Sequence, residues 1–194
     1  MDKNMTKKLA LTGLMAALCY IAFTFLKIPI PTPGGGTTAI HIGNAFCVLA
    51  ALILGGVYGG LSGAIGMTIA DLMDPIFITS APKTFFLKFM IGLITGFVAH
   101  KISHIDDEHP KTYIIKWSLL SCGIGLLFNV FMDPIIGYLY KTYLLKVPAD
   151  AAKIMATIAA AATLTNAVIS TILATVIYVV LLSLIHISEP TRPY

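Results

Sequence analysis

The sequence predicts an all-α fold, an integral membrane bundle of six transmembrane helices that forms one domain over residues 1–181. Of the 194 residues, 57% are hydrophobic and only 11% are charged, whereas soluble domains carry roughly 25% charged residues. The hydrophobic residues fall into runs of about 17 to 25, and an α-helix needs about 20 residues to cross the hydrocarbon core of a bilayer. The runs are therefore predicted to be membrane spans.

The first half of the chain is predicted to hold three spans. Span 1 is expected over residues 8–26, and residues 27–38 contain three prolines and three glycines, so they are expected to form a loop. Span 2 is expected over residues 39–54 and span 3 over residues 57–73, on either side of a turn at Gly55-Gly56. Both spans are short, so they could instead form a re-entrant hairpin. Because they come as a pair, the orientation of the later spans would be the same in either case.

The second half is predicted to hold three more spans, joined by a charged connector at residues 104–111 and a loop that contains Lys146 and Pro148. These spans are expected over residues 83–102, 113–140 and 152–181. Residues 182–194 resemble a translated sequencing adapter, and we expect them to be an artefactual tail. No residues remain for a soluble domain.

Glycines recur every four residues in two of the predicted spans. Gly55 in the turn begins a series that continues with Gly59 and Gly63 in span 3, and Gly92 and Gly96 follow the same spacing in span 4. Small residues at this spacing allow helix backbones to approach closely within lipid. The spacing predicts tight internal packing.

Several polar residues lie within the predicted spans. Placing a polar side chain in the hydrocarbon core costs free energy, so such residues indicate function by default. They occupy the starts of spans 2 and 4, the ends of spans 3 and 5, and the first half of span 6. In a chain that alternates in direction, all these positions lie in the half of the membrane opposite the amino terminus, which predicts one polar cup. The candidate substrate-binding residues are His41, Asn44, Asp71, Asp74, Thr84, Lys88, Asn129, Asp133 and Asn166.

The same polar residues allow a structural interpretation. Lys88 could pair with Asp71 or Asp133, because buried charges usually pair. Asp74 and Asn44 could cap helices. For any single residue this alternative stays open, but it explains the whole set less well.

Two kinds of metal site are also conceivable. Asp71 and Asp74 could hold magnesium diphosphate as in a membrane prenyltransferase, but the second acidic motif that such a site needs is missing. The histidines and carboxylates of residues 100–109 could bind a metal, although a connector this polar is usually just solvated. We therefore expect no metal and no other cofactor.

Several function classes are disfavoured by the sequence. The glycines at residues 34–36 are not followed by Lys-Ser/Thr, and no GxxxxGK[ST] motif occurs, so the chain is not expected to hydrolyse ATP through a P-loop. The net charge of +4 is spread over several loops and gives no nucleic-acid footprint. Lysines divide evenly between the two sides of the predicted bundle, so the positive-inside rule gives no orientation. A solute cup without its own ATPase must use a gradient or a partner's energy.

Four stretches of the sequence resemble one known family. They are residues 37–46 (TTAIHIGNAF), 54–66 (LGGVYGGLSGAIG), 70–72 (ADL) and 81–88 (APKTFFLK). They resemble the substrate-binding S component of energy-coupling-factor (ECF) vitamin transporters, most closely the riboflavin-type group, whose members differ in substrate. The resemblance covers residues 7–181. It implies a six-helix cell-membrane protein, not an enzyme, with both termini in the cytoplasm and a vitamin bound near the outer face.

The resemblance also implies partners, namely a transmembrane T component and two ABC ATPases that power release of the vitamin. In this family an alanine-x-x-x-alanine pattern on the first helix docks on the T component, and the corresponding small face here is Ala10, Gly13 and Ala17. The loop over residues 27–40 is expected to close over the ligand. A stand-alone proton-coupled transporter of a small solute is the alternative, and a membrane enzyme is the third.

Overall fold

The computed structural model describes residues 3–33 and 36–188, and six α-helices account for most of them. The helices are α1 (Lys3–Phe25), α2 (Gly43–Leu54), α3 (Gly56–Met73), α4 (Ala81–Phe97), α5 (Lys111–Leu139) and α6 (Ala149–Ser188). Shorter elements are the strands β1 (Lys27–Thr32) and β2 (Gly36–His41), a 3-10 turn η1 (Ile78–Ser80), and the π-helical segments η2 (Val98–Ile102) and η3 (Tyr140–Leu144). The predicted all-α bundle is confirmed.

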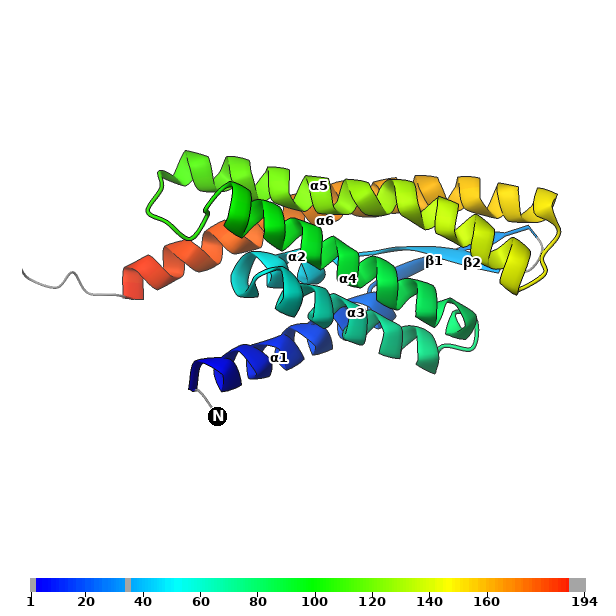
Figure 1. The fold of residues 1–194 in the computed structure, drawn as a ribbon, viewed down its shortest axis with the longest axis horizontal. Helices are drawn as coiled ribbons and strands as arrows, with labels where there is room; N and C mark the ends of the chain where they lie inside the picture. The colour runs from blue at the N-terminus through cyan, green and yellow to red at the C-terminus, as the bar shows by residue number, and fades with distance from the viewer. Residues whose placement is uncertain (1–2, 34–35, 189–194) are drawn as a thin grey trace, which may run out of the picture.

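The helices lie roughly along one long axis (Figure 1). α1 begins and α6 ends towards one end of the molecule, whereas the β1-β2 hairpin and the turn between α5 and α6 lie at the other. Within the described residues, four helical stretches are long and apolar enough to cross a membrane: Met5–Phe25, Ile78–Ile102, Lys111–Leu144 and Ala149–Leu184. The 12-residue α2 rises only about 18 Å, so it does not cross a bilayer by itself.

The segment between α1 and α2 corrects the prediction. The expected loop at residues 27–38 is an antiparallel hairpin whose register runs from Lys27↔His41 to Thr32↔Gly36, and helix α2 begins at Gly43 rather than at residue 39. Alternate prolines in β1 prevent a helix but are tolerated in an edge strand. Thr37, Thr38 and Ile40 are β-branched and favour the extended backbone of β2. Gly34 and Gly35 of the predicted loop lie outside the described residues.

The seam between α3 and α4 is packed backbone against backbone. A Cβ atom added at Gly92 would overlap the backbone of Gly60, and one added at Gly96 would overlap the backbone of Gly56. Helices approach this closely only where both carry small residues. The close packing predicted from the glycine spacing is present.

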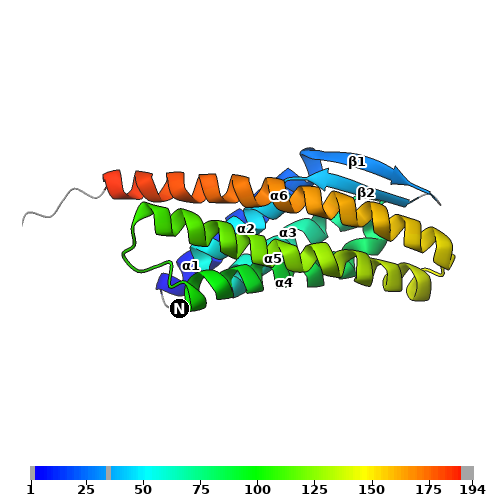
Figure 2. The ribbon, with the colours of Figure 1, turned by 90° about the horizontal axis from the view of Figure 1, so that it is seen from above.

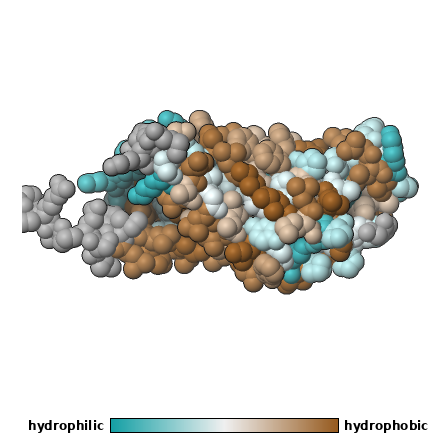
Figure 3. All heavy atoms as spheres, turned by 90° about the horizontal axis from the view of Figure 1, so that it is seen from below, coloured by the Kyte–Doolittle hydropathy of each residue, from teal (hydrophilic) through white to brown (hydrophobic). Residues whose placement is uncertain are grey.

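The outer surface of the bundle is apolar along much of its length. Figure 3 shows hydrophobic residues over most of one face, with hydrophilic residues mainly towards the two ends. Leu14 of α1, Phe131 of α5 and Val176 of α6 are among the large hydrophobic side chains that are more than half exposed. An exposed apolar surface of this extent fits lipid rather than water.

Candidate functional site

A cavity of about 290 Å³ lies at the hairpin end of the bundle. Its walls come from the end of α1, β2, the start of α2, the end of α3, η1, the start of α4, the end of α5, η3 and the first half of α6. The hairpin runs beside α6 in Figure 2, and β2 packs on this helix. All six helices and strand β2 therefore meet around one space in the half of the molecule opposite the amino terminus.

Most of the candidate residues predicted from the sequence come together around this cavity. Eight of the nine line it: His41, Asn44, Asp71, Thr84, Lys88, Asn129, Asp133 and Asn166. Asp74 is not among the lining residues. Lys83 and Lys141 line the cavity as well, although neither is among the candidate residues selected from the sequence.

Asp74 instead anchors the hairpin from outside the cavity. Its Oδ2 accepts a hydrogen bond from Lys27 Nζ at 2.6 Å, and its Oδ1 accepts one from the backbone N–H of Ile76 at 3.0 Å. Asp74 follows the last residue of α3, and the Lys27 ammonium beside it lowers the pKa of its carboxyl below the usual range. The ion pair ties the first residue of β1 to the end of α3.

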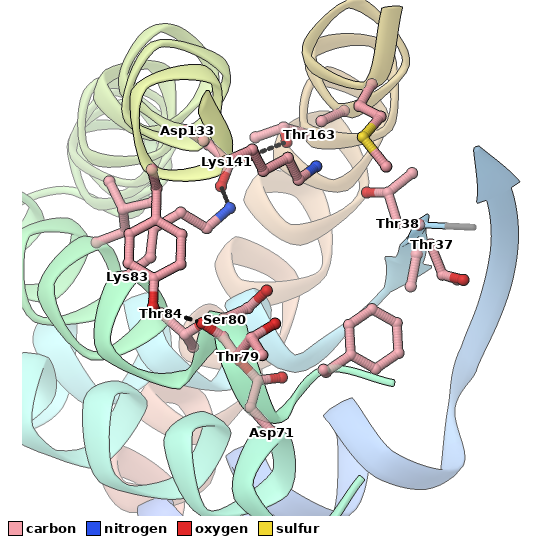
Figure 4. A pocket seen from close by; sticks show the side chains of 18 of the residues that line it. Thr37, Thr38, Asp71, Thr79, Ser80, Lys83, Thr84, Asp133, Lys141 and Thr163 are labelled. Carbon is pink, nitrogen blue, oxygen red and sulfur yellow. Dashed lines mark hydrogen bonds and ion pairs between the residues drawn. The ribbon is translucent and has the colours of Figure 1, made fainter. Parts of the chain in front are cut away.

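Asp133 is paired with a residue that the sequence analysis did not select. Lys83 Nζ lies 2.8 Å from Asp133 Oδ1, and Thr163 donates a hydrogen bond to Asp133 Oδ2 at 3.2 Å. The pair joins α4 to α5, with α6 attached through Thr163 (Figure 4). Lys83 directly precedes the candidate residue Thr84 at the start of α4, and this position could have identified it from the sequence.

Lys88 has a neutral partner rather than a carboxylate. Its Nζ donates a hydrogen bond to Asn44 Oδ1 at 2.8 Å, and the two residues are only 8% and 1% exposed. Within residues 3–33 and 36–188, no carboxylate oxygen lies within ion-pair distance of Lys88. The alternative pairing with Asp71 or Asp133 is therefore wrong for this structure.

Three buried polar atoms on the cavity residues lack a partner. Thr84 donates a hydrogen bond to Asp71 Oδ2 at 2.5 Å, but Asp71 Oδ1 has none. Asn129 Oδ1 and His41 Nδ1 are likewise buried and unpaired. Hydroxyl groups aside, these three are the buried side-chain polar atoms without a partner in the described part of the chain. Such atoms are rare in folded proteins and require an explanation.

Asn166 has a different arrangement from Asn129. Its Oδ1 accepts a hydrogen bond from the backbone N–H of His41 at 2.9 Å, and its Nδ2 donates one to the backbone carbonyl of Ala39 at 3.0 Å. Both ends of the amide are thus bound to β2. Asn166 fixes the strand to α6 and forms part of the cavity wall.

The π-helical segment η2, which follows α4, holds a histidine that is hydrogen-bonded to the connector. His100 Nδ1 lies 2.6 Å from Asp106 Oδ2, and its Nε2 lies 3.0 Å from the carbonyl oxygen of Ala51 at the end of α2. Nowhere in the described part of the chain do three or more metal-ligating side chains gather closely enough to hold a metal ion. This arrangement ties the connector to α2.

The small residues of α1 lie on its outer face. Ala10, Gly13 and Ala17 are all exposed, and a Cβ atom added at Gly13 would meet nothing within 4 Å. The neighbouring Ala16 is buried against the bundle. The stripe is therefore not used for packing inside this chain.

Comparison with known proteins supports one family. The family model described as the S component of the ECF-type riboflavin transporter matches residues 3–183. This range contains every residue that lines the cavity and the exposed stripe of α1. A search of the curated proteins finds no match to the chain.

Proposed function

This chain belongs to the ECF-type riboflavin transporter S component family, and we propose that it binds one water-soluble vitamin with high affinity in the cavity at the hairpin end. Membership of this family makes the chain a multi-pass membrane subunit for vitamin uptake and not an enzyme. The cavity volume of about 290 Å³ is close to the lower end of the range for small-molecule sites, roughly 300 to 1,000 Å³.

The set of unpaired polar atoms is the observation that carries this proposal. Asp71 Oδ1, Asn129 Oδ1 and His41 Nδ1 come from α3, α5 and β2, and all three residues line the same cavity. A buried polar atom without a hydrogen bond costs about 1–3 kcal/mol. A ligand that supplies these hydrogen bonds recovers this free energy on binding.

The hairpin is proposed to cover the bound vitamin. β2 contributes Thr37, Thr38 and Ala39 to the cavity wall, and Figure 4 shows Thr37 and Thr38 across the cavity from Asp71. β2 is held by Asn166, whereas β1 is held at its base by the Lys27 to Asp74 pair. Opening the hairpin at these contacts would admit the vitamin.

The chain is proposed to work in the cell membrane with both termini in the cytoplasm, so that the cavity faces outwards. A transmembrane T component and two ABC ATPases would supply the energy for release. The exposed stripe of Ala10, Gly13 and Ala17 on α1 is the proposed contact with the T component, because small residues allow another helix to approach closely.

Gly13→Leu tests the assembly part of the proposal. A Cβ atom added at Gly13 meets nothing within 4 Å, so vitamin binding by the purified variant should stay unchanged while uptake by cells that contain the T component and ATPases is lost. Gly123→Leu on α5 is the matched control, because a Cβ there also meets nothing within 4 Å, and it should leave uptake intact. Normal uptake by the Gly13→Leu protein would rule out the stripe as the contact.

Dependence on the partners separates the proposal from a stand-alone transporter. Cells that contain this chain without the T component and ATPases should bind the vitamin at their surface but not accumulate it. Accumulation that requires only this chain and a proton gradient would favour the alternative.

A further inference from the structure

The charges around the cavity do not balance. Three lysines line it, Lys83, Lys88 and Lys141, against two carboxylates, Asp71 and Asp133. Lys83 and Asp133 form an ion pair at 2.8 Å. Two lysines and one carboxylate then remain, which leaves an excess of one positive charge next to the space where a ligand would sit.

Lys88 is the buried lysine of this group that has no charged partner among the described residues. It is 8% exposed, and its ammonium group donates a hydrogen bond to the neutral Asn44 amide. Burial of an ammonium group is very costly unless an opposite charge compensates it. Neither Asp71 nor Asp133 lies within 4 Å of Lys88 Nζ, so no carboxylate of the described residues forms an ion pair with this ammonium group.

The remaining carboxylate and the third lysine lie apart. Figure 4 shows Asp71 at one side of the pocket, near Thr79 and Ser80, and Lys141 at the other, near Thr163. Lys141 belongs to η3 and is partly exposed, and it takes part in none of the ion pairs of the described residues. A lysine nearer the surface than Lys88 can attract an anion on its way into the site.

We propose that the vitamin bound here carries one anionic group, a carboxylate or a phosphate, which forms an ion pair with Lys88 and enters past Lys141. This inference rests on the proposed function and specifies its substrate class. An anion at Lys88 completes the charge balance of the cavity and forms a charge-assisted hydrogen bond, which is about twice as strong as a neutral one. A cationic ligand would add to the existing excess, and a neutral ligand would leave Lys88 without a counter-charge.

Matched pairs of vitamins that differ only in the anionic group test the inference. The probes are pantothenate with pantothenol, nicotinate with nicotinamide, riboflavin 5′-phosphate with riboflavin, and pyridoxal 5′-phosphate with pyridoxal. Each is titrated into the purified full chain by calorimetry. We expect the acidic member of one pair to bind at least tenfold more tightly than its neutral counterpart, and the successful pair shows whether the group is a carboxylate or a phosphate.

The outcomes separate this inference from the proposed function. A neutral member that binds as tightly as its acidic counterpart overturns the anionic substrate and leaves vitamin binding intact. A folded protein that binds no probe, nor thiamine or biotin, contradicts the proposed function and the inference with it.

Removal of the lysine charge gives the second arm of the test. Lys88→Met should weaken binding of the acidic probe by roughly tenfold to a hundredfold, while binding of its neutral counterpart changes less than threefold. Lys153→Met is the control, since Lys153 is exposed on α6 and does not line the cavity. If Lys88→Met fails to fold, Lys88→Gln, which keeps a donor for Asn44, replaces it. An equal loss for both probes overturns the ion pair.

Discussion

The seam between α3 and α4 and the cavity at the hairpin end differ in how completely their residues are packed and hydrogen-bonded. In the seam, Gly60 and Gly92 bring two backbones into contact with no space left. In the cavity, Asp71 and Asn129 hold buried polar atoms that nothing in the described chain satisfies. The seam is complete in the free protein, whereas the cavity lacks a partner. Substitutions in the seam should therefore destroy folding, whereas substitutions at the unpaired polar residues of the cavity should change binding while the fold survives.

The largest effect is expected in the seam. Gly92→Ala places a methyl group on the backbone of Gly60, which cannot move aside as a flexible side chain can. Overpacking of this kind costs about 1–3 kcal/mol or more, and we expect little folded protein. Gly123→Ala is the matched control on an open face. The measurement is the yield and thermal unfolding temperature of both variants in the same detergent, and equal values would contradict the proposed tight seam.

The next largest effect is expected at the ion pair beside the cavity. Lys83→Met leaves the Asp133 carboxylate without its ammonium partner, and both side chains are less than one fifth exposed. Removal of one partner of a buried pair costs about 3–5 kcal/mol, and some solvent access here reduces the expected loss to about 2 kcal/mol. Asp133→Asn in the same chain should restore much of the unfolding temperature. Without such rescue, the pair is not what stabilises this region.

A binding effect without loss of stability is expected at Asn129. Asn129→Leu removes an unpaired buried oxygen, so the unfolding temperature of the free protein should stay the same or rise, while vitamin affinity falls roughly tenfold or more. Asn166→Leu is the contrasting variant, because it leaves the backbone groups of Ala39 and His41 without their hydrogen-bond partners. It should lower both stability and affinity. Equal behaviour of the two variants would remove the distinction between a ligand contact and a structural amide.

The smallest effect is expected at the hairpin base. The pKa of Asp74 is lowered in the folded protein by its hydrogen bond with Lys27, so this contact stabilises the hairpin above the unfolded pKa of the carboxyl and is lost as pH falls through the folded pKa. Acidification below about pH 4 should loosen the hairpin, as measured by faster thiol labelling of a Thr32→Cys variant. Asp74→Asn should remove most of this pH dependence.

Long apolar runs made most of the helices predictable. The spans expected at residues 57–73 and 113–140 agree with α3 (Gly56–Met73) and α5 (Lys111–Leu139) to within two residues, because span length and hydrophobicity are local properties. The hairpin was missed because proline and glycine mark the end of a helix without showing which strands then pair.

Long-range contacts limited the prediction of the site. Because successive spans alternate in direction, the sequence predicted that the polar residues lie at one level of the membrane. It did not predict which side chains pair, because pairing depends on which helices are neighbours. Lys83 meets Asp133 across 50 residues of sequence, and Asn166 meets His41 across 125. The residue types were therefore predictable, while their division into paired, structural and unpaired groups required the structure.

Thiol labelling in intact cells tests most directly whether the cavity faces outwards and holds the vitamin. The three natural cysteines, Cys19, Cys47 and Cys122, are buried, so single cysteines at Thr38 in the cavity wall and at Asp107 in the exposed connector can be followed. An impermeant maleimide should label position 38 from outside, and a mixture of water-soluble vitamins should slow this reaction, whereas position 107 should react only after permeabilisation. Labelling of position 107 from outside, or a reaction at position 38 that the vitamins leave unchanged, would contradict the account.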